Sequence, residues 1–219
     1  IDALTFLASK RSAGKTLRFK DKDYIIEELT EDAFKDKGIQ YALFAAGGSI
    51  SEKFIPIAIE EGITVVDNSS FFRMHDDVPL IVPEVNDRDL DVNKKLIANP
   101  NCSTIQSMLP LEVVHELFGL KRVVYTTYQA VSGAGVGGVS DLNNKETKQF
   151  TRPIHNNVLP QIDVFDEDGY TKEELKMIDE TRKILSLPDL KVTATAVRVP
   201  VENGHSIAMN IECKRPVDL

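Results

Sequence analysis

The sequence has little of what several protein classes require. Its 219 residues contain no tryptophan and two cysteines, Cys102 and Cys213. Two cysteines cannot build a disulfide scaffold, so we expect a reduced, cytoplasmic setting. The sequence has no apolar run near the roughly 20 residues that span a bilayer. We therefore expect no membrane partner.

Positive charge is also scarce. Lys and Arg number 26 against 34 Asp and Glu, which gives a net charge of −8. This acidic balance lacks the electrostatic footprint of a nucleic-acid binder, so no nucleic-acid partner is expected. The content of hydrophobic residues, 42%, and of charged residues, 27%, is ordinary for a globular protein. The length suggests one or two domains.

Short apolar runs alternate with helical patterns in the first half of the chain. The runs are typical of strands and cover residues 4–8, 24–29, 41–46, 64–67 and 96–98, of which 41–46 is expected to be buried. Between two of them, Ser51 is expected to cap a helix through Glu61, with Pro56 bending it or shifting its start. This alternation predicts a parallel α/β sheet.

The pattern changes after Cys102. Two helices are expected, at 103–118 and 172–185, and Thr171 with Glu174 forms a capping box for the second. Longer β-rich runs cover 123–131, 192–199 and 206–213, with a polar segment at 141–150. Long strands with separate helices indicate an α+β second domain.

The strongest chemical signal is Cys102 in the run Asn-Pro-Asn-Cys-Ser-Thr at 99–104. It lies at or just before a helix start, where free N–H groups and the helix dipole favour an anion. We therefore expect a lowered thiol pKa and a nucleophile. The alternative is a buried structural cysteine.

A turn at 199–205 supplies possible partners for the thiol. Because the turn joins two strands, Arg198 and His205 can point into one site. Arg offers a rigid fork for a carboxylate, and His titrates near neutral pH. His205 could equally be a plain surface residue.

Six motifs run in order over almost the whole chain, at residues 8–15, 67–74, 82–86, 99–106, 129–135 and 198–206. Through them the chain resembles the aspartate-β-semialdehyde dehydrogenase family. The resemblance implies that Cys102 attacks the acyl phosphate or aldehyde and carries a thioester. It implies that His205 is the acid/base, that Gln129 orients the acyl group, and that Arg198 holds the α-carboxylate.

The resemblance also assigns an anion subsite. Arg73, Asn101 and Lys176 are expected to bind the phosphate group, and Glu173 belongs to the same substrate patch. An acyl phosphate with a carboxylate is strongly anionic and requires several fixed cations. The alternative for Glu173 and Lys176, which lie one helical turn apart, is a solvated salt bridge on the helix surface.

A glycine pattern at 133–138 imitates the dinucleotide fingerprint. No apolar strand ending in an acid follows at the required distance, so the pattern is better explained as a glycine-rich active-site loop. Next to Gln129 in this loop, Ser132 and Gly133 are expected to contact the cofactor.

The cofactor implied by the resemblance is NADP. The loop after the first strand carries Lys10, Arg11 and Ser12, which suit a 2′-phosphate, where an enzyme preferring NAD would carry an acid. An exposed basic turn is the alternative for these three residues. Gly47 and Gly48 match a family loop that borders the cofactor, and no metal is expected.

The expected fold is α/β, with a Rossmann-like dinucleotide-binding domain at 1–101 and an α+β catalytic and dimerisation domain at 102–219. Since apolar segments begin and stop abruptly at the two ends, we expect a fragment. The resemblance implies that it lacks the family's first βα unit and its C-terminal segment. The implied reaction is the NADPH-dependent reduction of aspartyl phosphate to aspartate semialdehyde, in a homodimer or homotetramer. It is the branch-point step toward lysine, threonine and methionine.

Three alternatives stay open at this stage. N-acetyl-γ-glutamyl-phosphate reductases share the architecture, but they usually carry an aromatic directly after the cysteine, where this chain has Ser103. Glyceraldehyde-phosphate dehydrogenases lack the spacing of Arg198 and His205. A truncated chain without catalytic activity is the third.

Overall fold

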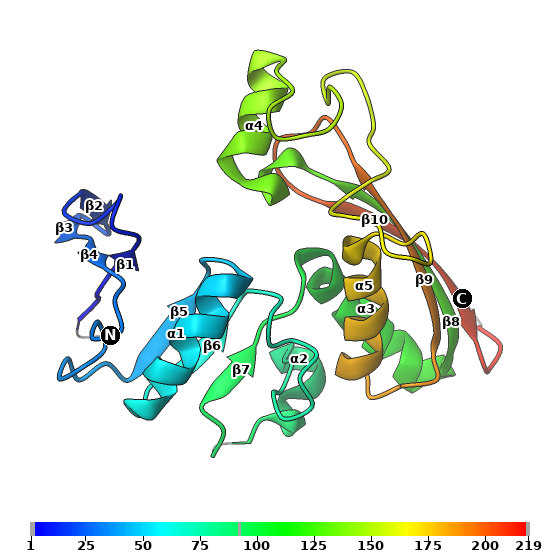
Figure 1. The fold of residues 1–219 in the computed structure, drawn as a ribbon. Helices are drawn as coiled ribbons and strands as arrows, with labels where there is room; N and C mark the ends of the chain where they lie inside the picture. Colours follow the sequence, from blue (N-terminus) through cyan, green and yellow to red (C-terminus); the bar gives the residue numbers. More distant parts are fainter. Residues whose placement is uncertain (1–2, 92, 218–219) are drawn as a thin grey trace.

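The computed structural model describes residues 3–91 and 93–217, so the outer limits of the expected domains, residues 1 and 219, lie outside the described residues. Figure 1 shows an N-terminal part and a C-terminal part side by side. In chain order the elements are β1 (Leu7–Ala8), β2 (Thr16–Phe19), β3 (Lys22–Ile25), β4 (Glu27–Glu28), β5 (Tyr41–Phe44), α1 (Gly48–Glu60), β6 (Thr64–Asp67), α2 (Pro83–Asn86), the 3-10 turn η1 (Asp87–Asp89), β7 (Leu96–Ala98), α3 (Cys102–Phe118), β8 (Leu120–Gln129), the 3-10 turn η2 (Val131–Ala134), α4 (Gly135–Asn144), α5 (Lys172–Ile184), β9 (Lys191–Arg198) and β10 (Ser206–Cys213).

The N-terminal part is built on a parallel sheet in the order β5-β6-β7, as the alternating pattern predicted. β6 and β7 match their expected bounds. The prediction that 41–46 is buried is wrong for β5, where Leu43 is 82% exposed and Tyr41 is 73% exposed. β5 is an edge strand of this sheet, and the side chains of Tyr41 and Leu43 point away from the core.

The segment expected as one strand at 24–29 is interrupted at Ile26. Its amide donates to the Lys15 carbonyl, and its own carbonyl accepts from Gly14, so Ile26 bonds to a loop instead of a strand partner. β3 therefore forms an antiparallel hairpin with β2, while β4 pairs in parallel with β1.

Helix α1 begins three residues before the expected cap at Ser51. Gly47 stands at the N-cap with φ 95°, a conformation that favours glycine, and lets the helix start directly after β5. The Ser51 hydroxyl instead donates to the buried Asp67 carboxylate at 2.8 Å. Pro56 lies inside the helix.

The C-terminal part is a three-stranded sheet in the order β10-β8-β9, with α3 and α5 packed on one face (Figure 1). β8 pairs in parallel with β9 and antiparallel with β10. β10 has the expected bounds, whereas β8 starts and ends earlier than the run 123–131 because residues 131–134 turn into η2. One hydrophobic core, including Val65, Leu111 and Tyr125, joins the two parts.

The two long helices α3 and α5 form where the sequence predicted them. α3 ends at Gly119, which takes φ 70°, and α5 carries the predicted capping box of Thr171 and Glu174. The polar segment 141–150, for which no helix was predicted, contributes its first four residues to α4. No helix in the described residues is long and apolar enough to cross a membrane.

Candidate functional site

Cys102 is the first residue of α3 and its side chain is accessible, so the alternative of a buried structural cysteine does not hold. Asn101 caps the helix, because its side-chain oxygen accepts from the amides of Ser103 at 2.8 Å and Thr104 at 3.2 Å. Pro100 precedes this cap and keeps the chain extended. Pro100 and the Asn101 cap together place the Cys102 sulfur at a helix start.

The expectation of a lowered thiol pKa is wrong. Desolvation by the surrounding chain raises the pKa of the Cys102 thiol, and the negative charge of Glu173 raises it further. Hydrogen bonding from Ser103 and the charge of Arg198 oppose this shift without reversing it. The thiol is therefore more protonated near neutral pH than a free cysteine.

The turn between β9 and β10 brings Arg198 and His205 together, as the sequence predicted. Both pack against Gly133, where a Cβ atom would lie 2.9 Å from Arg198 Nη1 and 3.4 Å from His205 Nε2. Arg198 is buried, and its Nη1 donates to the Ala130 carbonyl at 2.8 Å. Burial lowers the pKa of Arg198, while the charges of Glu173 and Cys102 raise it, so the guanidinium senses both groups.

His205 is half-buried and held by the backbone. Its Nδ1 accepts from the Ala130 amide at 3.0 Å, which assigns the proton of the neutral ring to Nε2. Burial lowers the pKa of His205, and the Arg198 charge adds to that effect. The neutral ring therefore presents an N–H donor on the side of Gly133.

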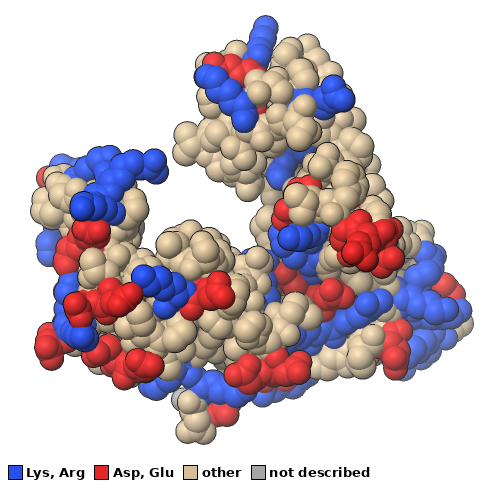
Figure 2. Space-filling view, viewed as in Figure 1, with Lys and Arg blue, Asp and Glu red and all other residues tan. Residues whose placement is uncertain are grey.

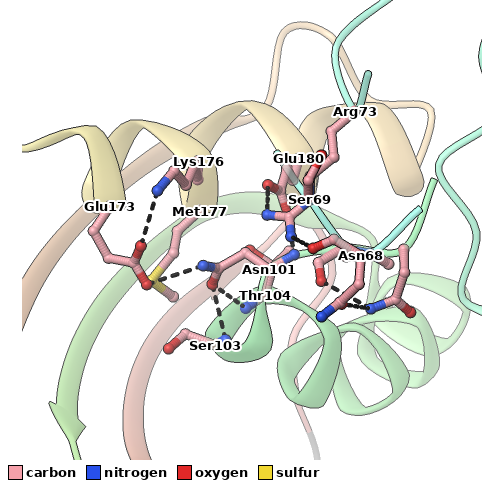
Figure 3. A network of polar contacts seen from close by, with 12 residues as sticks. Asn68, Ser69, Arg73, Asn101, Ser103, Thr104, Glu173, Lys176, Met177 and Glu180 are labelled. Atoms are coloured by element: carbon pink, nitrogen blue, oxygen red, sulfur yellow. Dashed lines mark hydrogen bonds and ion pairs between the residues drawn. The ribbon is translucent and has the colours of Figure 1, made fainter. Parts of the chain in front are cut away.

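Glu173 connects three of the predicted site residues, of which Asn101 and Lys176 are shown with it in Figure 3. Its Oε1 accepts from Asn101 Nδ2 at 2.9 Å and from Gln129 Nε2 at 3.2 Å. Its Oε2 lies 3.4 Å from Lys176 Nζ. Because the Glu173 side chain is only 8% exposed, the pair with Lys176 is not the solvated surface salt bridge considered above.

Arg73 and Lys176 line a pocket of about 220 Å³, whose cationic lining is completed by Lys172. Arg73 is buried, donates from Nη1 to Glu180 and from Nη2 to the Asn68 carbonyl, and leaves Nε without a hydrogen-bond partner among the described residues. This arrangement can receive an anion. Asn101 does not line this pocket, since its amide points to Glu173.

The residues expected to hold the cofactor lie in three separate places. Lys10 and Arg11 are exposed and follow β1 directly, at the carboxyl end of a strand, and Ser12 is half-buried beside them. Figure 2 shows Lys and Arg gathered over the β1–β4 unit, which a broad hollow separates from the α4 region. An exposed cationic loop suits a phosphate group.

Gly47 and Gly48 open α1 at the carboxyl end of β5. Among the described residues no side chain caps this helix start, and its first turn holds no acid, so its N–H groups fit a phosphate-bearing cofactor. Ser132 lies in η2, where its amide donates to the Glu202 carbonyl, beside the exposed Gly133. Of the glycine pattern at 133–138, Gly133 is the residue that packs on Arg198 and His205.

Sequence reasoning missed several residues of the site. Glu180 holds Arg73, Asp163 Oδ2 lies 3.2 Å from Lys176 Nζ, and Phe150 lies beneath Arg198, with 5.9 Å from its ring centre to Cζ. Each contact joins segments far apart in the chain, so no local motif could reveal it.

Comparisons with known proteins agree on one family. Residues 1–92 match the family model for the semialdehyde dehydrogenase NAD binding domain, and 111–219 match the dimerisation domain of the same proteins. The chain is 49% identical over 231 residues to the aspartate-semialdehyde dehydrogenase of Aquifex aeolicus, covering 99% of this chain and 67% of the relative.

Solved structures of the same family have a similar fold. Aspartate semialdehyde dehydrogenase II of Vibrio cholerae, complexed with ASA, superposes with a TM-score of 0.93 at 44% identity, covering 100% of this chain and 68% of that one. The Candida albicans enzyme with NADP gives a TM-score of 0.75 at 27% identity, covering 99% and 66%. The chain spans about two thirds of the length of these proteins.

Proposed function

The chain belongs to the aspartate-semialdehyde dehydrogenase family, and we propose that it catalyses the reversible, NADPH-dependent conversion of L-4-aspartyl phosphate to L-aspartate 4-semialdehyde and phosphate. The observation that carries this proposal is the accessible Cys102 at the start of α3, within reach of the charges of Arg198 and Glu173. A nucleophile beside a buried guanidinium and an anion pocket is what an acyl phosphate with a carboxylate requires.

Binding places the two anionic ends of the substrate apart. Arg198 receives the α-carboxylate, because its planar fork can donate two parallel hydrogen bonds. Arg73 and Lys176 bind the phosphate in the pocket that they line. Gln129, held by Glu173, orients the acyl group between these ends.

The first chemical step forms a thioester. The sulfur of Cys102 bonds to the acyl carbon, the carbon–oxygen bond to phosphate breaks, and phosphate leaves with the electron pair. The sulfur reacts as the thiolate, so the thiol first gives its proton to solvent; because the pKa of the thiol is raised, the step accelerates as the pH increases.

The second step converts the thioester to the aldehyde. When bound, NADPH supplies a hydride to the acyl carbon. His205 donates from Nε2 to the oxygen on which negative charge develops, and Cys102 then leaves as the carbon–sulfur bond breaks. Lys10, Arg11, Ser12, Gly47, Gly48, Ser132 and Gly133 are proposed to hold the cofactor.

The remaining assignments are proposals of the same kind. We divide the chain into a cofactor-binding domain at 1–101 and a catalytic domain at 102–219. The sheet face opposite α3 and α5 exposes Tyr128 at 46%, and a second copy of the chain is proposed to cover it in a homodimer or homotetramer. The reaction is proposed to run in the cytoplasm, on the route to lysine, threonine and methionine.

A phosphate-dependence assay with two cysteine variants tests the proposal. The protein is incubated with L-aspartate 4-semialdehyde, NADP and inorganic phosphate, and NADPH formation is followed by absorbance. Cys102→Ala should abolish turnover, while Cys213→Ala, which removes a half-buried thiol at the end of β10, should retain it. Turnover by Cys102→Ala, or turnover without phosphate, would contradict the mechanism.

A further inference from the structure

Glu180 joins two parts of the site through a single buried carboxylate (Figure 3). It lies on α5 with its side chain 1% exposed, and Oε1 accepts from Arg73 Nη1 at 2.9 Å. Oε2 accepts from the backbone amide of Asn101 at 2.6 Å. Glu180 therefore touches both a residue of the anion pocket and the residue immediately before Cys102.

Only an ionised carboxylate of this length satisfies both contacts. Each oxygen of Glu180 faces an N–H donor, so glutamine or a protonated acid would turn a donor toward one of the two. Aspartate keeps the charge but is one methylene shorter. The pair is buried, so losing one partner leaves the other charge or donor without compensation.

The loop that carries Arg73 is fixed independently by a second residue of α5. Lys183 Nζ donates to the carbonyls of Arg73 at 2.7 Å, His75 at 2.7 Å and Val78 at 2.9 Å. Lys183 thus holds the backbone of the loop, whereas Glu180 holds the guanidinium itself. With Nη2 donating to the Asn68 carbonyl, the plane of the guanidinium is set from two sides.

We propose that Glu180 is a positioning residue for the phosphate subsite: it holds the Arg73 guanidinium in the orientation that receives the phosphoryl group, and its contact with the Asn101 amide ties that subsite to the start of the helix that carries Cys102. The inference rests on the proposed function, in which Arg73 binds phosphate. Glu180 lines the same pocket beside Arg73, and its effect on phosphate binding passes through the Arg73 guanidinium.

A rival role makes the opposite prediction. If Glu180 only reduced the positive charge of the pocket, removing its charge would strengthen phosphate binding by Coulomb attraction. A positioning role predicts weaker binding, because Arg73 loses its fixed orientation. The sign of the change therefore separates the two roles.

Two substitutions test separately the charge and the length of the Glu180 side chain. Glu180→Asp keeps the charge and loses the reach, and Glu180→Gln keeps the size and loses the charge. Glu116→Gln, an exposed position on α3, removes the same unit charge and serves as the control. The dissociation constant of inorganic phosphate is measured by calorimetry, and the KM for phosphate and for the semialdehyde are measured in the oxidative direction.

Both Glu180 variants should bind phosphate about tenfold more weakly or worse, with a larger rise in the KM for phosphate than in the KM for the semialdehyde. Tighter binding by Glu180→Gln, or unchanged binding by Glu180→Asp, would overturn the proposal. A wild-type protein that binds no phosphate would instead refute the proposed function. A purely structural role would raise both KM values together.

A double variant keeps the test usable if the single variants fold poorly. Arg73→Met with Glu180→Gln leaves no uncompensated buried charge, so it should fold more readily than either single change. If Glu180 acts through Arg73, this double variant should bind phosphate no more weakly than Arg73→Met alone. An additional loss on top of the Arg73→Met effect would contradict the inference.

Discussion

Gly133→Ala adds one methyl group where the site has no room for it. The new Cβ would lie 2.9 Å from Arg198 Nη1, well inside the ~3.5–4.0 Å of an ordinary contact. Arg198 cannot swing away easily, because it is buried, bonded to the Ala130 carbonyl and placed over the Phe150 ring. The guanidinium must therefore shift by roughly half to one ångström to restore that contact distance.

The expected cost follows from that displacement. A misplacement of about 1 Å at a substrate-positioning group can reduce the rate by about 100-fold. We expect kcat/KM for the semialdehyde to fall by about 10–100-fold, which corresponds to ~1.4–2.7 kcal/mol of transition-state stabilisation. The free energy of unfolding should change by less than ~1 kcal/mol, since Gly133 itself is exposed.

Gly137→Ala is the matched control. There the added Cβ would lie even closer, 2.7 Å from Gln149 Oε1, but this atom is the end of an exposed side chain that can move. Activity should stay within about twofold of wild type, because alanine also suits the interior of α4. Equal kcat/KM values for the Gly133 and Gly137 variants would refute the steric argument.

Three further predictions address the Cys102 thiol, the Arg198 guanidinium and the loop that carries Arg11. Stoichiometric iodoacetamide near pH 7 should label the accessible Cys102 before the half-buried Cys213, and the rate should keep rising beyond the pH at which an ordinary thiol levels off, because the pKa of Cys102 is raised; preferential labelling of Cys213 would count against this. Arg198→Lys should lose about 2–4 kcal/mol of transition-state binding, since the lysine lacks the paired donors, and kcat/KM near wild type would refute the assignment. Arg11→Ala should weaken NADP binding by about tenfold or more and leave NAD binding unchanged, because a charge-assisted hydrogen bond contributes roughly 1.5–3 kcal/mol; equal weakening of both would indicate a role in the fold.

Local signals predicted the elements whose causes are local. Thr171 and Glu174 lie three residues apart and bond to each other, so the start of α5 could be predicted from the sequence. Strands β6, β7 and β10 match their predicted bounds because an apolar pattern and its flanking residues define them.

Helix α4 could not be predicted in this way. It contains Gly135, Gly137 and Gly138, which disfavour a helix. Tertiary contacts compensate: the buried Asp141 accepts from three backbone amides of residues 148–150, which closes the following loop against the helix. Such a contact depends on folding and has no pattern in the sequence.

The electrostatics of the site were beyond sequence reasoning for the same reason. A helix start at Cys102 suggested a lowered pKa, but the fold desolvates the thiol and also places the negative charge of Glu173 of α5 near it, and both effects raise the pKa. The role of Glu180 likewise depends on α5 packing against the Arg73 loop. The nucleophile could be found from the sequence, whereas the groups that tune and orient its surroundings could not.

The central claim is that Cys102 carries the acyl group between phosphate and the aldehyde. Its most direct test is intact and peptide mass spectrometry after mixing the protein with L-aspartate 4-semialdehyde and NADP in the absence of phosphate. The account predicts one aspartyl thioester on the peptide that contains Cys102, formed together with one equivalent of NADPH and released by added phosphate. NADPH formed without that adduct, or an adduct on another residue, would contradict it.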